Sequence, residues 1–472
     1  MVQFLTESAL INALAAILSV GVAFLALPLL NQAIGEELSL SLLHTSTFWI
    51  GFMLVILVGT IFSGLYPAFV LSSFRPAKVL KSVRLSPAKG FSLRRGLIVF
   101  QFIVSALLIA GTYLVYRQIM YMKNEDLGFD TEKILVVNGP RVIIKGQQPA
   151  ELVSLFNDFS NKLTQHPSIT SVCATSQVPS KGYLGDWNVL AMGASESASR
   201  EGKVLFTDTS FFRTYDLKFL AKRPFPADYT QYEWLVLNEE AVEDFGLGSA
   251  EEAILSELRV LGDTLGVLGV VKDIHWSSLR EARVPILFTL DKYYGAYFSI
   301  KMSMNNIQES IAHIEAAYRS VYPDDPFSYF FLDDDFNRQY QADLQFGQLF
   351  SVFSALAIFI ACIGLFALVS FSVALRIKEI GIRKVLGAGV GHLMVLLSRE
   401  YLLLLLIAVG VAVPLIWVGG RAWLENYAFK VGISLDLFLL PGVALLIISF
   451  ITVSYRTYAA AQANPVDSLK VE

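Results

Sequence analysis

Six long apolar runs constrain the fold of this chain more than any other feature. A helix needs about 20 apolar residues to cross a hydrocarbon core of about 30 Å, and each run approaches or exceeds that length. No run has a charged residue or a histidine in its middle, where a charge is costly. We therefore predict an α-helical transmembrane bundle of six spans without an embedded proton or ion relay. The runs are Leu10–Leu30, Phe48–Leu71, Gly96–Tyr116, Phe350–Leu375, Tyr401–Val418 and Leu437–Val453.

Basic residues in two connecting loops predict the orientation of these spans. The linker Ser72–Arg95 contains basic residues and no acidic residue, and the loop after the fourth span is also rich in Lys and Arg. Such loops lie preferentially in the cytoplasm. We therefore expect both termini in the cytoplasm and the long region between the third and fourth spans outside. Residues 117–345 of that region carry 21 basic and 32 acidic residues.

The region between the third and fourth spans has the pattern of an α+β domain. Short apolar segments predict strands and amphipathic segments predict helices. The residues from Phe206 to Leu265, with a helix from Asn238 to Phe245, predict an inserted second lobe. The expected strands are Lys133–Asn138, Trp234–Asn238 and Val267–Lys272, and the expected helices are Ala150–Gln165 and Ile307–Tyr318.

The sequence contains no motif typical of an enzyme or a cofactor site. A P-loop is absent, so ATP hydrolysis would need a separate subunit. The glycines at Gly262, Gly266 and Gly269 fit strands and turns better than a dinucleotide fingerprint. The histidines lack zinc-site spacing. The acidic run Asp333–Asp335 fits a solvated loop or a helix N-terminus better than a cation site. We expect no catalytic residue, cofactor or metal.

The first apolar run is predicted to be a retained span. It contains Glu7 before the apolar residues and no Lys or Arg, unlike the positive start of a signal peptide.

The segment Arg376–Ala388 has the strongest functional pattern in the chain. Apolar residues recur at helical spacing between charged ones, and Gly387 is a natural helix end. This pattern predicts a short amphipathic helix at the membrane surface. The pattern alone fits either an anchor to lipid headgroups or a docking helix for a cytosolic partner.

This segment resembles the coupling helix of ABC transporter permeases of the macrolide-exporter (MacB) and FtsX type, where the helix sits in a cleft of the ATPase subunit. Further motifs resemble the same family in order and spacing. They are Leu127-Gly128-Phe129-Asp130, Val236-Leu237-Asn238-Glu239, Gly269-Val270-Val271-Lys272-Asp273, Arg75-Pro76-Ala77 and Asn464-Pro465-Val466. The resemblance implies a MacB-like periplasmic core domain and location in the bacterial inner membrane. It also implies a coupling role for Arg376, Glu379, Gly381, Arg383, Lys384 and Gly387.

Part of the membrane region occurs twice. Two apolar runs separate Glu7 from Pro76, and two separate Glu400 from Pro465. A duplicated permease of the family contains, twice, one span, a periplasmic domain, a coupling helix and three spans. The first copy here has only its last two spans. We therefore expect either an N-terminally truncated product or a separate polypeptide that supplies the remainder.

The predicted domains follow from these patterns. Residues 1–71 are two spans of a first FtsX-like unit, and 72–95 are a basic cytoplasmic linker. Residues 96–116 are a span, 117–346 a periplasmic domain with the inserted lobe at about 206–265, and 347–472 an FtsX-like permease domain with the coupling helix at 376–388.

The expected function is that of a permease subunit that transmits ATPase-driven motion to the periplasmic domain, for efflux or extrusion. Expected partners are a cytosolic ABC ATPase, a second permease chain or missing N-terminal half, a periplasmic adaptor and membrane lipid, and no nucleic acid. The alternatives are a membrane-tethered sensor or adaptor without ATPase coupling, and a secondary transporter. The latter would need charged or broken-helix sites at the membrane midplane.

Overall fold

The computed structural model divides into two compact units. The helical unit comprises Met1–Arg117, Asp343–Trp423 and Gly432–Glu472, and the α+β unit comprises Gln118–Ala342 and Leu424–Val431. The residues described are 2–34, 39–72, 90–140, 149–226, 228–229, 233–260, 262–292, 295–375, 382–383, 386 and 389–462.

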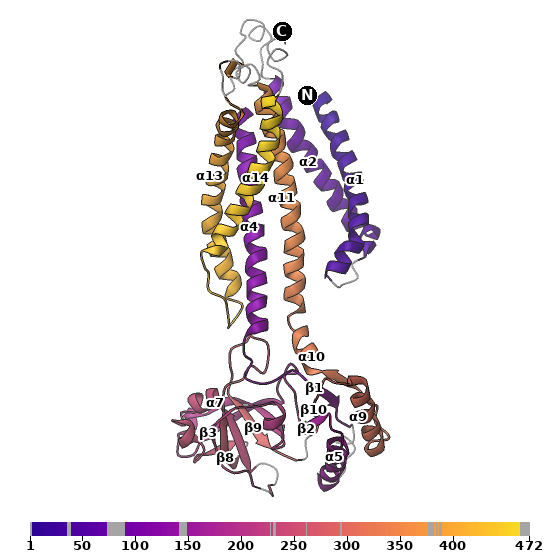
Figure 1. Cartoon of the computed structure of the whole chain (residues 1–472), viewed down its shortest axis with the longest axis vertical. Coiled ribbons are helices and arrows are strands. Elements are labelled where there is room, and N and C mark those ends of the chain that lie inside the picture. Colours follow the sequence, from indigo (N-terminus) through magenta and orange to yellow (C-terminus); the bar gives the residue numbers. More distant parts are fainter. Residues whose placement is uncertain are drawn as a thin grey trace. The chain divides into compact units, whose positions relative to one another are not determined.

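Six long helices coincide with the six predicted apolar runs (Figure 1). All six are long and apolar enough to cross a membrane by length and composition, which confirms the prediction of six apolar helices. A 3-10 turn, η1 (Leu40–His44), separates the first two. The helices are α1 (Val2–Ile34), α2 (Ser46–Ser72), α4 (Gly90–Asn124), α11 (Gln341–Leu375), α13 (Val390–Leu424) and α14 (Asp436–Gln462).

The helices extend well past the apolar runs. The third run ends at Tyr116, whereas α4 continues to Asn124, and α13 begins at Val390, before the run that starts at Tyr401. Apolar composition marks only the residues suited to hydrocarbon, whereas backbone hydrogen bonds can continue a helix into polar surroundings. The extra turns carry most of the polar contacts described below.

The strands of the α+β unit form one sheet, part of which closes on itself. Pairing proceeds from β4 through β3, β7, β8, β6 and β9, and β9 returns to β4 as a parallel neighbour. From β4 the sheet continues through β2, β10 and β1 to β11. The strands are β1 (Ile134–Asn138), β2 (Ile169–Thr175), β3 (Gly185–Ala191), β4 (Arg200–Thr207), β5 (Phe219–Lys222), β6 (Trp234–Asn238), β7 (Glu257–Val260), β8 (Asp263–Val271), β9 (Ile286–Leu290), β10 (Tyr297–Met302) and β11 (Tyr329–Phe331).

Three apolar clusters hold this unit together. One fills the closed ring with residues from all six of its strands and is covered by α7 (Glu239–Asp244) and α8 (Ala250–Ala253). A second lies between the open part of the sheet and two helices, α5 (Pro149–Thr164) and α9 (Ile307–Val321). The third surrounds Trp276 and includes α6 (Phe211–Thr214).

The strands and helices predicted for this unit are all present, with ends shifted by a few residues. The cluster inside the ring includes Val189 and Val204, which precede the predicted lobe at 206–265. The lobe boundaries therefore stay a prediction. Gly262 has a φ of 96° at the turn between β7 and β8, and Gly266 lies within β8.

The acidic run Asp333–Asp335 lies in the first turn of the short helix α10 (Leu332–Arg338). Asp335 accepts a hydrogen bond from Lys181 at 2.9 Å. Carboxylates are favourable at a helix N-terminus. The run therefore has the structural role that the sequence favours.

Candidate transmission site

The predicted ATPase-coupling segment lies mostly outside the described residues. Of its predicted contact residues, Arg376, Glu379, Gly381, Lys384 and Gly387 lie outside that part of the chain. Ile382 and Arg383 are helical, and the Leu386 N–H donates to the Ile382 carbonyl at 3.0 Å. This spacing is that of an α-helical turn. The role of the segment in coupling stays a prediction.

An ion pair joins the beginning of α4 to α13. Arg95 donates to Glu400, and the two side chains are 40% and 20% exposed. A pair with this exposure contributes at most about 1 kcal/mol to stability, because water and salt screen it. The contact is therefore one that can open at small free-energy cost.

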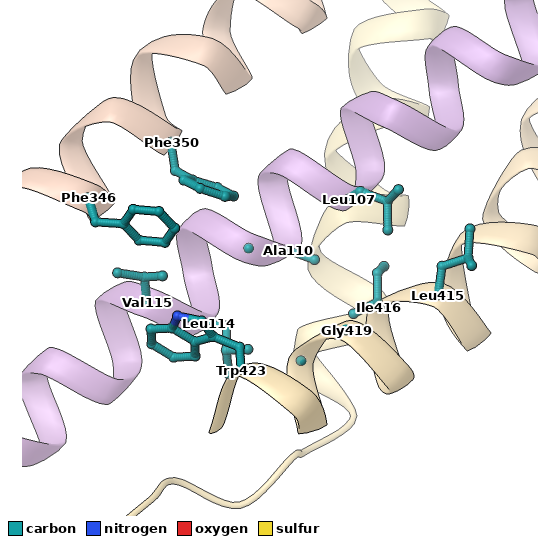
Figure 2. A pocket seen from close by; sticks show the side chains of 12 residues that line it. Leu107, Ala110, Leu114, Val115, Phe346, Phe350, Leu415, Ile416, Gly419 and Trp423 are labelled. Carbon is teal, nitrogen blue, oxygen red and sulfur yellow. The ribbon is translucent and has the colours of Figure 1, made fainter. Parts of the chain in front are cut away.

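An apolar cavity of about 180 Å³ lies between α4, α11 and α13 (Figure 2). The rings of Phe346 and Phe350 face it from α11, and Trp423 faces it from α13. A cavity lined by apolar side chains leaves the surrounding helices without close partners on that side. Small relative movements of the three helices can therefore occur here at less cost than in a filled core.

Glycines allow close contacts between α4 and its neighbours. A Cβ on Gly111 would lie 3.0 Å from Cε1 of Phe350, and one on Gly420 would lie 3.2 Å from Cδ2 of Leu114. Small residues let the backbones of membrane helices approach closely. The backbone of α4 therefore lies close to α11 and α13 at these glycines, next to the apolar cavity between the three helices.

A second polar cluster lies within the helical unit at the beginning of α14. Arg117 donates to both carboxylate oxygens of Asp436, at 3.2 and 3.0 Å. The hydroxyl of Tyr113 donates to the same carboxylate at 2.5 Å. Asp436 also has a short contact with Ser434. This cluster fixes the start of α14 to α4.

The connection between α13 and α14 is built into the α+β unit. We call Leu424–Val431 the strap. The backbone N–H groups of Ala428 and Phe429 donate to the carbonyls of Arg280 and Leu279, at 3.0 and 3.2 Å. These bonds fix the strap to the loop that precedes β9.

Gln118, the residue after Arg117 on α4, clamps the strap with both ends of its amide. Its Nε2 donates to the Phe429 carbonyl at 2.8 Å, and its Oε1 accepts from the Val431 N–H at 2.9 Å. The side chain is completely buried. Loss of a buried amide leaves its backbone partners unsatisfied, which costs more than an exposed contact would.

Aromatic contacts complete the attachment of the strap. The ring of His275 lies edge-on to Phe429, with centroids 4.5 Å apart, and Arg280 lies over Tyr427 at 5.1 Å. Burial, reinforced by Arg283, lowers the pKa of His275 from 6.5 to about 4. His275 is therefore neutral at physiological pH and packs as an aromatic side chain.

Sequence patterns indicated little of this site. In the sequence, Arg95 is only one basic residue of the linker and Glu400 only marks the repeat. Their ion pair could not be predicted, because residues 305 positions apart leave no local pattern. Gln118 lies just beyond a predicted span. Aromatic Tyr427 and Phe429, in a short segment between two predicted spans, are the signal that could have indicated a docked strap.

Six helices long and apolar enough to cross a membrane indicate a multi-pass membrane protein, and most of its α+β unit lies between the third and fourth of these helices in the chain. Residues 351–465 match the FtsX-like permease C-terminal family. This match confirms the resemblance to FtsX-type permeases and supports an ABC transporter permease. It covers most of α11, all of α13 and α14, and the strap between them.

Several solved structures are similar to the chain at low identity. The periplasmic region of MacB from Actinobacillus actinomycetemcomitans is 14% identical with a TM-score of 0.30, and covers 43% of this chain and 91% of its own. The extracellular domain of the noncanonic ABC-type transporter YknZ from Gram-positive bacteria is 9% identical with a TM-score of 0.29, and covers 42% and 99%. A domain of a Porphyromonas gingivalis protein named as a permease is 14% identical with a TM-score of 0.30, and covers 43% and 92%. No curated protein matches the sequence.

Proposed function

We propose that this chain is the permease subunit of an ABC transporter of the MacB/FtsX type, and that it transmits ATPase-driven motion to its extracytoplasmic domain for efflux or extrusion. In this proposal the segment 376–388 contacts a cytosolic ATPase. Both chain termini lie in the cytoplasm of a bacterial cell, and the α+β unit lies on the other side of the inner membrane. ATP is hydrolysed in the separate subunit.

The strap is the observation that carries this proposal. A loop that only joins two membrane helices needs no place in a folded domain, yet Leu424–Val431 is part of the α+β unit. Because α13 and α14 flank the strap directly, a displacement of either helix pulls on the domain. The continuous helix α4 leads into the same unit through Gln118. Mechanical transmission therefore has a covalent route through three helices.

The exposed Arg95–Glu400 pair is consistent with movement of α4 relative to α13 at the beginning of α4. Glu400 is the eleventh residue of α13, the helix that follows the proposed ATPase contact in the chain. A weak exposed ion pair can break and re-form as the helices shift. Packing that has two discrete arrangements is the general basis of such switching.

Charge reversal tests the ATPase contact. The full chain is purified from membranes of its host, and co-purifying P-loop ATPase is quantified. Arg383→Glu together with Lys384→Glu should reduce the recovered ATPase about tenfold or more, because charge-assisted contacts at an interface are lost and repulsion replaces them. The matched control is reversal of Arg200 and Lys218, two exposed residues of the α+β unit, which should leave recovery unchanged.

Two results would contradict the proposal. Full ATPase recovery with the double variant would remove the assigned docking surface. Labelling of a cysteine placed at position 383 by a membrane-impermeant reagent added outside the cell would remove the proposed orientation. Stable isolation of the chain without any ATPase would instead favour the sensor or adaptor alternative.

A further inference from the structure

A polar cavity of about 520 Å³ lies beside strand β3 in the α+β unit. It is lined by β3, by Arg259 of β7, by the β7–β8 turn at Gly262 and by the loop that contains the 3-10 turn η3 (Glu196–Ala198). All of its lining residues belong to the α+β unit. Its volume falls in the range of about 300–1,000 Å³ that is typical of small-molecule sites.

One side of β3 has a neighbouring strand along only part of its length. Val189–Ala191 pair with β7, whereas Gly185–Asn188 pair on the β4 side alone among the strands that the structure describes. We call Gly185–Asn188 the open edge of β3. Such an edge presents backbone N–H and C=O groups. Asp186, Trp187 and Asn188 all line the cavity, although successive side chains of a strand point to opposite faces. The cavity therefore lies along the open edge, where both faces can contribute.

The charged side chains of the cavity are balanced in pairs. Lys203 of β4 donates to Asp186, and Arg259 donates to Glu196 at 3.0 Å. Both carboxylates that line the cavity thus have a cation beside them. An anion or a cation would meet an equal number of like and opposite charges there. The lining therefore favours a neutral ligand over a charged one.

The other lining groups suit a ligand that carries many hydroxyl groups. The exposed side-chain amide of Asn188 can donate and accept hydrogen bonds, and it has no hydrogen-bond partner in the part of the chain that the structure describes. Trp187 lines the cavity, and its ring lies edge-on to Phe206 with the centroids 5.5 Å apart. A sugar has hydroxyl groups around its rim and C–H groups on its faces, and aromatic rings pack against such apolar surface.

The position of β7 disfavours an extended peptide as the ligand. A peptide that binds to a strand edge forms an additional strand. Beyond Asn188 the same side of β3 is occupied by β7, so an added strand could pair only with the open edge. A compact ligand, by contrast, can fill the cavity and reach the open edge at the same time.

We propose that the cavity beside β3 binds a short neutral oligosaccharide, whose hydroxyl groups bond to Asn188 and to the open edge of β3 and whose sugar ring packs against Trp187. This site gives the α+β unit a ligand of its own. The proposal goes beyond the permease function and does not depend on ATPase coupling.

Oligosaccharide binding by the full chain tests the proposal. The chain is reconstituted into lipid nanodiscs, because many detergents carry sugar headgroups, and is applied to an array of neutral, acidic and basic oligosaccharides. The neutral oligosaccharide with the strongest signal is then titrated by calorimetry. We expect saturable binding whose affinity changes less than about twofold between low and high salt, because no ion pair with the ligand is screened.

Variants at the exposed position 188 locate the binding site. Asn188→Ala should weaken binding about tenfold, as expected for loss of the hydrogen bonds of one amide. Asn188→Phe places a ring in the cavity and should abolish binding. Asn305→Ala, at an exposed asparagine before α9, is the matched control and should bind like the parent chain. Equal thermal midpoints of the parent chain and all three variants establish that the variants are folded.

Three results would overturn the proposal. The first is that no neutral oligosaccharide on the array binds. The second is that Asn188→Phe binds as tightly as the parent chain. The third is a preference for acidic oligosaccharides, or for pentaalanine as a peptide probe, over every neutral oligosaccharide. None of these results depends on whether Arg383 contacts an ATPase.

Discussion

The two ends of α4 are held in different ways. Near its start, Arg95 makes one partly exposed ion pair with Glu400. Near its end, Arg117 binds Asp436 within the helical unit, and the buried amide of Gln118 clamps the strap within the α+β unit. An exposed ion pair weakens gradually with salt or distance, whereas a buried amide is either satisfied or costly. The first contact suits a movable end and the second a fixed end.

Removal of the buried Gln118 amide should cause the largest loss of stability among these variants. Gln118→Ala leaves the Phe429 carbonyl and the Val431 N–H without their partners, at about 2 kcal/mol each. We expect the strap to be destabilised by about 4 kcal/mol, measured as faster hydrogen exchange of its backbone amides. The control is Gln165→Ala at an exposed position. Unchanged exchange in Gln118→Ala would show that the clamp does not hold the strap.

Overfilling the middle of α4 should have the next largest effect. Gly111→Leu places a side chain against Phe350, where even a Cβ would lie at 3.0 Å. Overpacking of this kind costs about 2 kcal/mol. Gly96→Leu, on the same helix with open space around it, is the control. Equal thermal midpoints of the two purified variants would argue against close packing at Gly111.

Acid should weaken the strap end through His275. The unfolded chain takes up a proton near pH 6.5, whereas the folded chain does so only near pH 4, because burial and Arg283 lower the pKa of His275. Its contribution to stability is therefore complete above pH 6.5 and is lost as the pH falls toward 4. Between pH 7 and pH 5.5 the loss should be about 1.2 kcal/mol.

Thermal midpoints of the parent chain and His275→Gln at several pH values measure this difference. The variant should have a shallower dependence on pH in that window. Parallel curves for the two proteins would exclude His275 as the source.

Removal of the ion pair at the start of α4 should cause the smallest loss of stability. Arg95→Ala or Glu400→Gln should lower the stability of the purified chain by at most about 1 kcal/mol, and less at high salt. The charge exchange Arg95→Glu with Glu400→Arg should recover most of the loss. A loss as large as that of Gln118→Ala would mean that both ends of α4 are equally fixed.

The sequence was sufficient for the six long apolar helices and for three of the eleven strands that the structure describes in the α+β unit, β1, β6 and β8. Apolar length predicts spans directly, and short apolar segments such as Trp234–Asn238 predict buried strands. The closed ring of strands was not predicted, because it depends on β4 pairing with β9, about 80 residues later. Local periodicity contains no information on such pairings.

The candidate site was less predictable than the fold. Charge and spacing indicated the segment 376–388, which includes Arg383. Gln118 carries no charge and lies just past an apolar run, so nothing in its neighbourhood distinguishes it from an ordinary polar residue. Its importance arises from burial against a strap about 310 residues away.

The ring of strands in the α+β unit has a consequence for solubility. Unpaired strand edges offer hydrogen-bonding groups on which strands of other chains can assemble into aggregates. Each of the six ring strands has a partner on both sides, so they offer little to such assembly. The outermost strands are β11, with three residues, and β5, with four. Edges this short give a neighbouring chain few hydrogen bonds, which protects the folded α+β unit from assembling with other copies.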